Sequence, residues 1–155
     1  CTRVLDGLGI SNTLVCSPAG DLLYVADSLL RIIDALDIDP ATGAAGARRP
    51  FVHTRGETYG PDGSAVDVEG YVWNAQWGGA RLVRYAPDGS VDRIVPVPVD
   101  HPSSCAFGGE SLATLYVTTA RWLLDEAALA RQPWAGGLLA FEPGVPGLPL
   151  PPFGG

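Results

Sequence analysis

A chain of 155 residues has the usual length of one domain and can bury a substantial core. Its hydrophobic content of 46% excludes a disordered chain, and its net charge of −7 makes it a poor partner for a nucleic acid backbone. No apolar run reaches the length of about 18 residues that a membrane-spanning helix needs. The 20 glycines and 14 prolines indicate many turns and therefore many short strands.

The cysteines are odd in number and widely spaced, at Cys1, Cys16 and Cys105. No Cys-x-x-Cys pair occurs, so the sequence predicts neither a zinc knuckle nor a disulfide framework. A reducing compartment is therefore expected, and we assign the cytoplasm.

A repeat runs through the chain. Each unit opens with a polar, turn-like group around Asn12, Asp62 or Ser104, and the intervals between these residues are 50 and 42. A β-rich run follows in each unit, at residues 23–26, 71–74 and 115–118. A period of about 40–50 residues with several strands per unit is typical of propeller blades. We therefore expect an all-β propeller fold in a single domain, with three blades at about residues 1–50, 51–98 and 99–155.

Turn signals support this division. Residues 39–43 and 87–89 are expected to be turns, and Gly78-Gly79 separates two strands. The one helical candidate is 123–131, interpreted as an insertion between two strands of the last blade. The tail at 143–155 is rich in Pro and Gly and is expected to be extended.

The sequence offers little support for a catalytic nucleophile. The sequence lacks a Gly-x-Ser-x-Gly elbow, and its only histidines are His53 and His101. His101 and Cys105 would lie roughly 13 Å apart along a strand, which argues against a Cys–His pair. The glycine pairs lack the spacing and the lysine of a phosphate-binding loop.

Side-chain oxygens are the remaining candidates for a functional site, as ligands of a metal ion. If the repeat register is correct, Asn12, Asp62 and Ser104 occupy equivalent places in successive blades and converge on the central channel. Amide and carboxylate oxygens suit calcium, magnesium or manganese. The alternative is structural, because Pro-Asp-Gly is first a turn sequence, and the same tripeptide at Asp88 is interpreted as a turn.

The aromatic residues divide in a similar way. Tyr24, Trp73 and Tyr116 are expected in the core between blades, whereas Trp77, beside two glycines, is the candidate for a sugar pocket. Among the acids, Asp27 either faces the channel or ends a strand. Asp67 and Glu69 are expected in a solvated turn.

Several stretches also match a known family in order and spacing. They are residues 10–12, 23–28, 60–63, 73–79, 103–109, 115–121 and 132–137. Through them the chain resembles the regucalcin/gluconolactonase family, also called senescence marker proteins. The resemblance implies a six-bladed propeller with one divalent metal in its channel, and hydrolysis of sugar-acid lactones.

The resemblance also implies roles for individual residues. Asn12 falls on the family's asparagine metal ligand, and Asp62 on its metal-binding aspartate, which is also the proposed general base. Calcium is the first choice of metal, with zinc, manganese or magnesium as alternatives. Independently of the resemblance, Ser104 is a candidate for substrate contact from its place in the repeat, and Trp77 from its position beside two glycines.

The chain also departs from the family pattern. Thr13 stands where the family usually has Gly, and Ala19 where Asp usually precedes Gly20. Only the C-terminal half of the family is matched, so a third ligand, a glutamate near the family's N-terminus, has no counterpart. The substrate-holding arginine and asparagine of the first half are missing too.

We therefore expect the complete protein to be a lactonase and this chain alone to be inactive. A missing N-terminal half or a second copy of the chain would close the ring. The alternatives are a non-catalytic calcium-binding protein and a dimerising scaffold.

Overall fold

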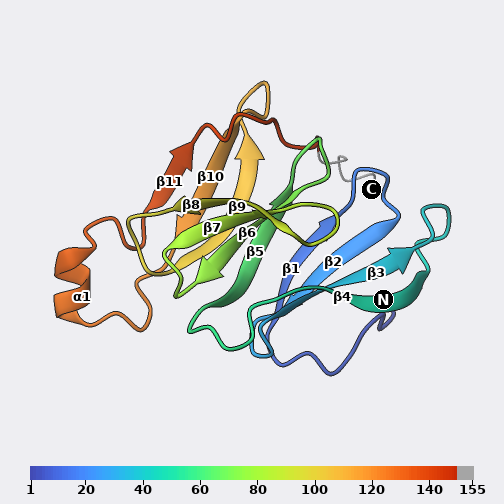
Figure 1. Ribbon diagram of the computed structural model, residues 1–155, viewed down its shortest axis with the longest axis horizontal. Helices are drawn as coiled ribbons and strands as arrows, with labels where there is room; N and C mark the ends of the chain where they lie inside the picture. The colour runs from blue at the N-terminus through green and yellow to red at the C-terminus, as the bar shows by residue number, and fades with distance from the viewer. Residues whose placement is uncertain (150–155) are drawn as a thin grey trace.

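The computed structural model describes residues 1–149 and consists of three antiparallel sheets placed side by side (Figure 1). The first sheet contains β1 (Ser11–Cys16), β2 (Leu22–Asp27), β3 (Ile32–Ile38) and β4 (Ala45–His53). The second contains β5 (Gly60–Val66), β6 (Val72–Trp77), β7 (Arg81–Tyr85) and β8 (Val91–Pro96). The third contains β9 (Pro102–Gly108), β10 (Thr114–Thr119) and β11 (Leu138–Phe141).

Within each sheet the strands follow one another in chain order, as expected for a blade. The first strands of the three sheets, β1, β5 and β9, lie next to one another (Figure 1). The expected all-β propeller architecture is therefore confirmed, and β1, β5 and β9 form the inner edge of three successive blades.

The core lies between the blades. One cluster joins the first two sheets and includes Tyr24 and Ile33; the other joins the last two and includes Trp73 and Leu115. Tyr24 and Trp73 are buried, as predicted. The prediction for Tyr116 is wrong, since this side chain is 38% exposed. It alternates along β10 with inward-facing residues and therefore lies on the uncovered face of the third sheet.

The expected turns are present, and the helical insertion is shorter than the sequence suggested. In the turn at residues 87–89, Asp88 accepts hydrogen bonds from the Ser90 N–H and hydroxyl. The helix α1 (Glu126–Arg131) lies between β10 and β11. It begins after Leu123 because Asp125 caps it, accepting a hydrogen bond of 2.7 Å from the Ala128 N–H.

The tail returns to the second blade, where Gly147 pairs with Asp67. Residues 150–155 of the tail that was expected to be extended lie outside the described residues. No helix within residues 1–149 is long and apolar enough to cross a membrane.

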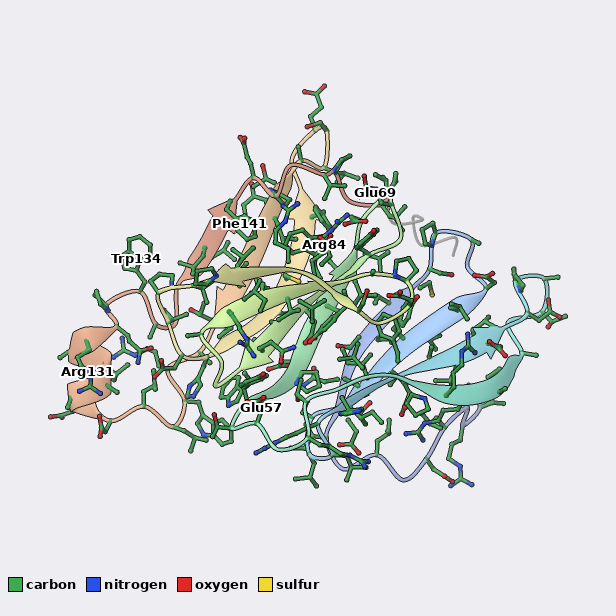
Figure 2. All side chains as sticks on the ribbon, viewed as in Figure 1. Glu57, Glu69, Arg84, Arg131, Trp134 and Phe141 are labelled. Carbon is green, nitrogen blue, oxygen red and sulfur yellow. The ribbon has the colours of Figure 1, made fainter. Side chains whose placement is uncertain are left out.

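Asp67 is the main correction to the sequence analysis. The side chain was expected in solvent but is 0% exposed. Its carboxylate accepts hydrogen bonds from Trp73 Nε1 at 2.9 Å and Arg84 Nε at 2.8 Å. Arg84 also pairs with Glu69 at 2.6 Å and with Asp92 at 2.9 Å, and Figure 2 shows Arg84 and Glu69 together on the second blade. This network satisfies a buried charge pair and ties the β5–β6 turn to β7 and β8.

Candidate metal centre

Two of the three repeat residues, Asn12 and Ser104, are paired at similar places in their blades. Asn12 on β1 pairs with Ala26 of β2, and Ser104 on β9 pairs with Thr118 of β10. Asp62 has no paired residue, because it lies in the irregular stretch of β5 between the Pro61–Gln76 and Ser64–Asn74 pairs. The inner strands of neighbouring blades are adjacent, and Asn12 and Ser104 line the same cavity between them.

Each of these strands departs from regular pairing at this level. The irregularities fall at residues 12–14 of β1, 61–64 of β5 and 102–104 of β9. A bulge re-aims side chains and often adjoins a functional site. The sequence analysis missed these bulges. One signal was available in the sequence, because Thr13 stands where the family that the chain resembles usually has Gly. In the structure Thr13 has a left-handed φ of 42°.

A cavity of about 410 Å³ opens beside the three inner strands. It is lined by Ser11, Asn12, Thr13, Leu14, Gly63, Ser64 and Ser104. Gly63 allows the close approach of two blades, because a Cβ there would collide with the Ser104 side chain. Asp62 is not among the lining residues and adjoins the cavity through Gly63.

Asp62 and Asn12 are neighbours in an unusual electrostatic setting. Burial raises the pKa of Asp62 to about 6, although the Gly63 N–H and the Asn12 side chain both act to lower it. None of the ion pairs within residues 1–149 includes Asp62. This half-buried carboxylate therefore lacks a protein cation nearby, and a bound cation would compensate its charge.

The donors at this place suit a hard metal ion. Asn12 and Asp62 offer amide and carboxylate oxygens, which are calcium-type ligands. The described part of the chain contains no group of three or more His, Cys, Asp or Glu side chains that could hold a metal. The two residues fit as part of a ligand set.

Ser28 holds Asn12 in place. Asn12 Nδ2 donates to Ser28 Oγ at 3.2 Å, and that hydroxyl donates to the Pro61 carbonyl at 2.7 Å. The neighbouring Asp27 has a structural role, since it is buried and accepts hydrogen bonds from four backbone N–H groups, among them that of Gly9. Burial acts to raise the pKa of Asp27, but these hydrogen bonds outweigh it and lower the pKa.

Trp77 lies at the same end of the blade as Asp62, since it pairs with Gly60. It stacks on His101, with ring centroids 4.3 Å apart and planes 4° apart. The Trp122 ring lies 6.0 Å away and that side chain is 70% exposed. The three rings form an aromatic group on the rim that holds the candidate metal residues.

The described side chains form no Cys–His pair at His101. Cys105 faces the core and its thiol donates to the Trp73 carbonyl at 3.3 Å. Burial raises the pKa of Cys105 to about 12. This thiol is therefore not an activated nucleophile.

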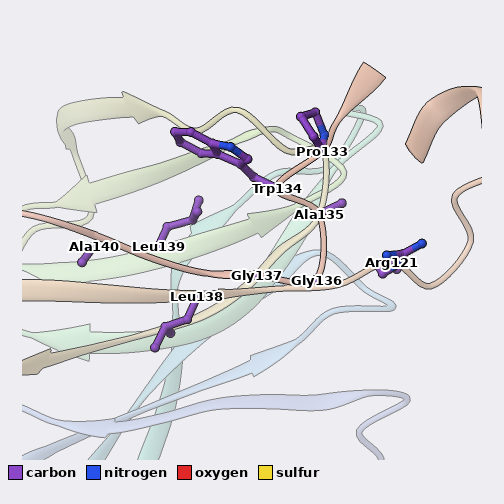
Figure 3. A pocket seen from close by; sticks show the side chains of 9 residues that line it. All are labelled: Arg121, Pro133, Trp134, Ala135, Gly136, Gly137, Leu138, Leu139 and Ala140. Atoms are coloured by element: carbon purple, nitrogen blue, oxygen red, sulfur yellow. The ribbon is translucent and has the colours of Figure 1, made fainter. Parts of the chain in front are cut away.

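A larger cavity of about 690 Å³ lies on the third blade, and its lining residues do not include Asn12, Asp62 or Ser104 (Figure 3). It is lined by Arg121 and residues 133–140. It contains none of the candidate metal or catalytic residues.

Comparison with known proteins decides the family. A sequence model of the family SMP-30/Gluconolactonase/LRE-like region matches residues 1–121. The chain belongs to this family. The resemblance seen in the sequence is confirmed.

Individual family members are similar over nearly the whole chain. L-arabinolactonase from Azospirillum brasilense is 43% identical over 151 residues, covering 97% of the chain and 49% of that relative. Regucalcin from Sus scrofa is 39% identical, covering 99% of the chain and 52% of that relative. The chain thus spans about half the length of the curated relatives it matches.

Solved structures of the SMP-30/gluconolactonase family agree with the fold. A calcium-binding protein, regucalcin, from Agrobacterium tumefaciens matches with a TM-score of 0.89 and 32% identity, covering 95% of the chain and 50% of that structure. A gluconolactonase from Xanthomonas campestris matches with a TM-score of 0.62 and 28% identity, covering 74% of the chain and 36% of that structure.

Proposed function

We propose that the chain is part of a metal-dependent enzyme that hydrolyses a sugar-acid lactone. The observation that carries the proposal is the Asn12–Asp62 pair, in which a half-buried carboxylate without a protein cation lies beside an amide at the inner edge of the blades. The similarity to proteins named L-arabinolactonase and gluconolactonase supports this substrate class.

In this proposal Asn12 and Asp62 bind one divalent ion through their side-chain oxygens. Calcium is the first candidate, supported by the relative described as a calcium-binding protein; zinc, manganese and magnesium are alternatives. Further protein ligands come from outside this chain, where the family resemblance expects a glutamate. The bound metal supplies a Lewis acid that polarises the ester carbonyl of the lactone.

The chain's own contribution to the reaction is proton transfer and orientation. A water oxygen attacks the ring carbonyl carbon, and the bond from that carbon to the ring oxygen breaks. Asp62 takes a proton from the attacking water, and this proton ends on the ring oxygen, which becomes a hydroxyl group of the open acid. A carboxylate has two oxygens, so the Asp62 side chain could both help to hold a metal ion and accept a proton.

Two further residues are proposed to contact the substrate. Ser104 lines the cavity beside Asn12, and its hydroxyl can bond a sugar hydroxyl group. Trp77 presents an aromatic surface on the same rim, where one face is already covered by His101. Their roles concern binding rather than bond cleavage.

We propose that the active protein is longer than this chain and that the chain alone is inactive. The half-length match to the relatives supports this view, with a second copy of the chain as the other way to cover the open blade faces. We also propose a cytoplasmic location, supported by three cysteines that are free thiols.

A second function is calcium binding without hydrolysis, favoured by the similarity to regucalcin described as a calcium-binding protein. A lactone assay on the complete protein separates the two functions. The proposed enzyme opens aldonolactones, loses activity in EDTA and regains it with one of the divalent ions. Tight calcium binding with no lactone opening would favour the second function.

A further inference from the structure

The main-chain carbonyl of Asp62 is held by two different blades. Thr13 Oγ1 of β1 donates a hydrogen bond to it across the gap between the first two sheets. Asn74 Nδ2 of β6 donates a second hydrogen bond to the same oxygen at 3.0 Å. Thr13 and Asn74 are both buried, so water competes little for these bonds.

Thr13 occupies a backbone conformation that a β-branched residue rarely adopts, with φ at 42°. Glycine would take this conformation without strain, but it has no hydroxyl group to donate. The Thr13 hydroxyl also lies 2.9 Å from Ser64 Oγ, on the far side of the β5 bulge. The Thr13 side chain thus forms hydrogen bonds with both Asp62 and Ser64, the two ends of the segment 62–64.

The orientation of Asn74 is set by a second amide. Gln76 Nε2 donates to Asn74 Oδ1, so the amino group of Asn74 faces the bulge. From there it reaches the carbonyls of Asp62 and Gly63 and the Ser64 hydroxyl, the last at 2.9 Å. The amide is buried and forms hydrogen bonds on both sides, which gives it one defined orientation.

We propose that Thr13 and Asn74 are positioning residues that set the distance between the two metal-binding side chains. Thr13 follows Asn12 directly in the chain and at the same time binds the Asp62 main chain, so one residue connects both ligands. Asn74 holds the same carbonyl from the other side. The inference rests on the proposed metal site at Asn12 and Asp62.

Three substitutions of Thr13 in the complete protein test the proposal, with calcium affinity measured by titration calorimetry and stability by thermal unfolding in EDTA. Thr13→Val keeps the shape and the strain but loses the hydroxyl, and should lower calcium affinity by about 10–100-fold, as for other residues that orient metal ligands. Thr13→Ser keeps the hydroxyl, so its calcium affinity should stay within about threefold of that of the unsubstituted protein.

Thr13→Gly separates positioning from stability. It relieves the strained φ, so the protein should fold. Although the family usually has Gly here, in this chain the variant would leave the Asp62 carbonyl with only the Asn74 hydrogen bond, so calcium affinity should fall as in Thr13→Val. This variant decides the question if Thr13→Val does not fold. Asn74→Leu should weaken calcium binding in the same direction.

The outcomes distinguish a failure of the positioning role from a failure of the proposed metal site. If Asp62→Asn abolishes calcium binding while Thr13→Val and Thr13→Gly bind like the original protein, the positioning role is wrong and the metal site stands. If Asp62→Asn itself leaves calcium affinity unchanged, the proposed metal site is wrong and the positioning role falls with it.

Discussion

Two identical Pro-Asp-Gly tripeptides offer a matched test of the metal site. Asp62 is half-buried in a bulge of the inner strand β5, beside Asn12. Asp88 is exposed in the turn between β7 and β8, where Ser90 lowers its pKa through hydrogen bonds from its hydroxyl and N–H. The substitutions Asp62→Asn and Asp88→Asn each remove one negative charge and keep the side-chain shape.

The expected change at Asp62 follows from its pKa, which rises from 3.8 to about 6. Two pKa units correspond to roughly 3 kcal/mol, and solvent screening at this partly open position reduces the figure to about 1–2 kcal/mol. Because the folded-state pKa is raised, ionised Asp62 destabilises the metal-free fold above pH 6. The penalty shrinks as the pH falls from 6 and is absent below the unfolded-state value of 3.8.

Asp62→Asn should therefore stabilise the metal-free protein by about 1–2 kcal/mol at pH 8, with no gain at pH 3. Calcium affinity should fall by more than about 100-fold, since even a residue that only orients a ligand contributes about 10–100-fold. Lactone hydrolysis by the complete protein should be abolished. Asp88→Asn should leave calcium affinity and lactone hydrolysis unchanged, and it should not stabilise the protein at pH 8, because Ser90 already stabilises the ionised Asp88 side chain.

Urea unfolding in EDTA at pH 3 and pH 8, calcium titration and a lactone assay measure these effects. Equal effects of the two substitutions on calcium binding would mean that Asp62 is only a turn residue. A metal-free Asp62→Asn protein that is less stable at pH 8 would refute the electrostatic reasoning.

Two other predictions concern buried groups away from the site. At pH 8 a thiol reagent should modify Cys1 and Cys16 but not Cys105, whose burial raises its pKa to about 12; mass spectrometry of the labelled protein checks this. Asp67→Ala should lower the free energy of unfolding by about 3–5 kcal/mol because it breaks a buried ion pair. Glu69→Ala should cost under about 1 kcal/mol because Glu69 is 59% exposed, and similar urea midpoints for the two variants would contradict this.

The architecture could be predicted because its signals are local. Turn residues such as those at 39–43 and 87–89 impose their geometry on the chain wherever they occur, and the repeat of such signals marks the blades. The error at Tyr116 has a different origin. Alternation along β10 divides its residues between two faces, but which face is covered depends on the neighbouring blade rather than on the sequence of the strand.

At the site, the repeat predicted that Asn12 and Asp62 occupy matching places, but it could not predict how they are held. The hydrogen bonds to the Asp62 carbonyl come from Thr13 and Asn74, which lie on other strands, and they depend on bulges that only the pairing register reveals. Asp67 was misjudged for the same reason. Its partner Arg84 is two strands away, and a polar turn sequence gives no sign of a buried ion pair.

The uncovered face of the third blade leads to a prediction about the isolated chain. The middle blade is covered on both sides, and five of the six residues of β6 are buried. The third blade packs one face on it and exposes the other, including Tyr116 and Leu138, the latter 65% exposed. Covering apolar surface is worth about 25 cal/mol per Å², so the 155-residue chain should associate in solution. Sedimentation should give a species heavier than 16.2 kDa without lactonase activity. A stable monomer with full metal-dependent activity would show that neither a further half nor a second copy is needed.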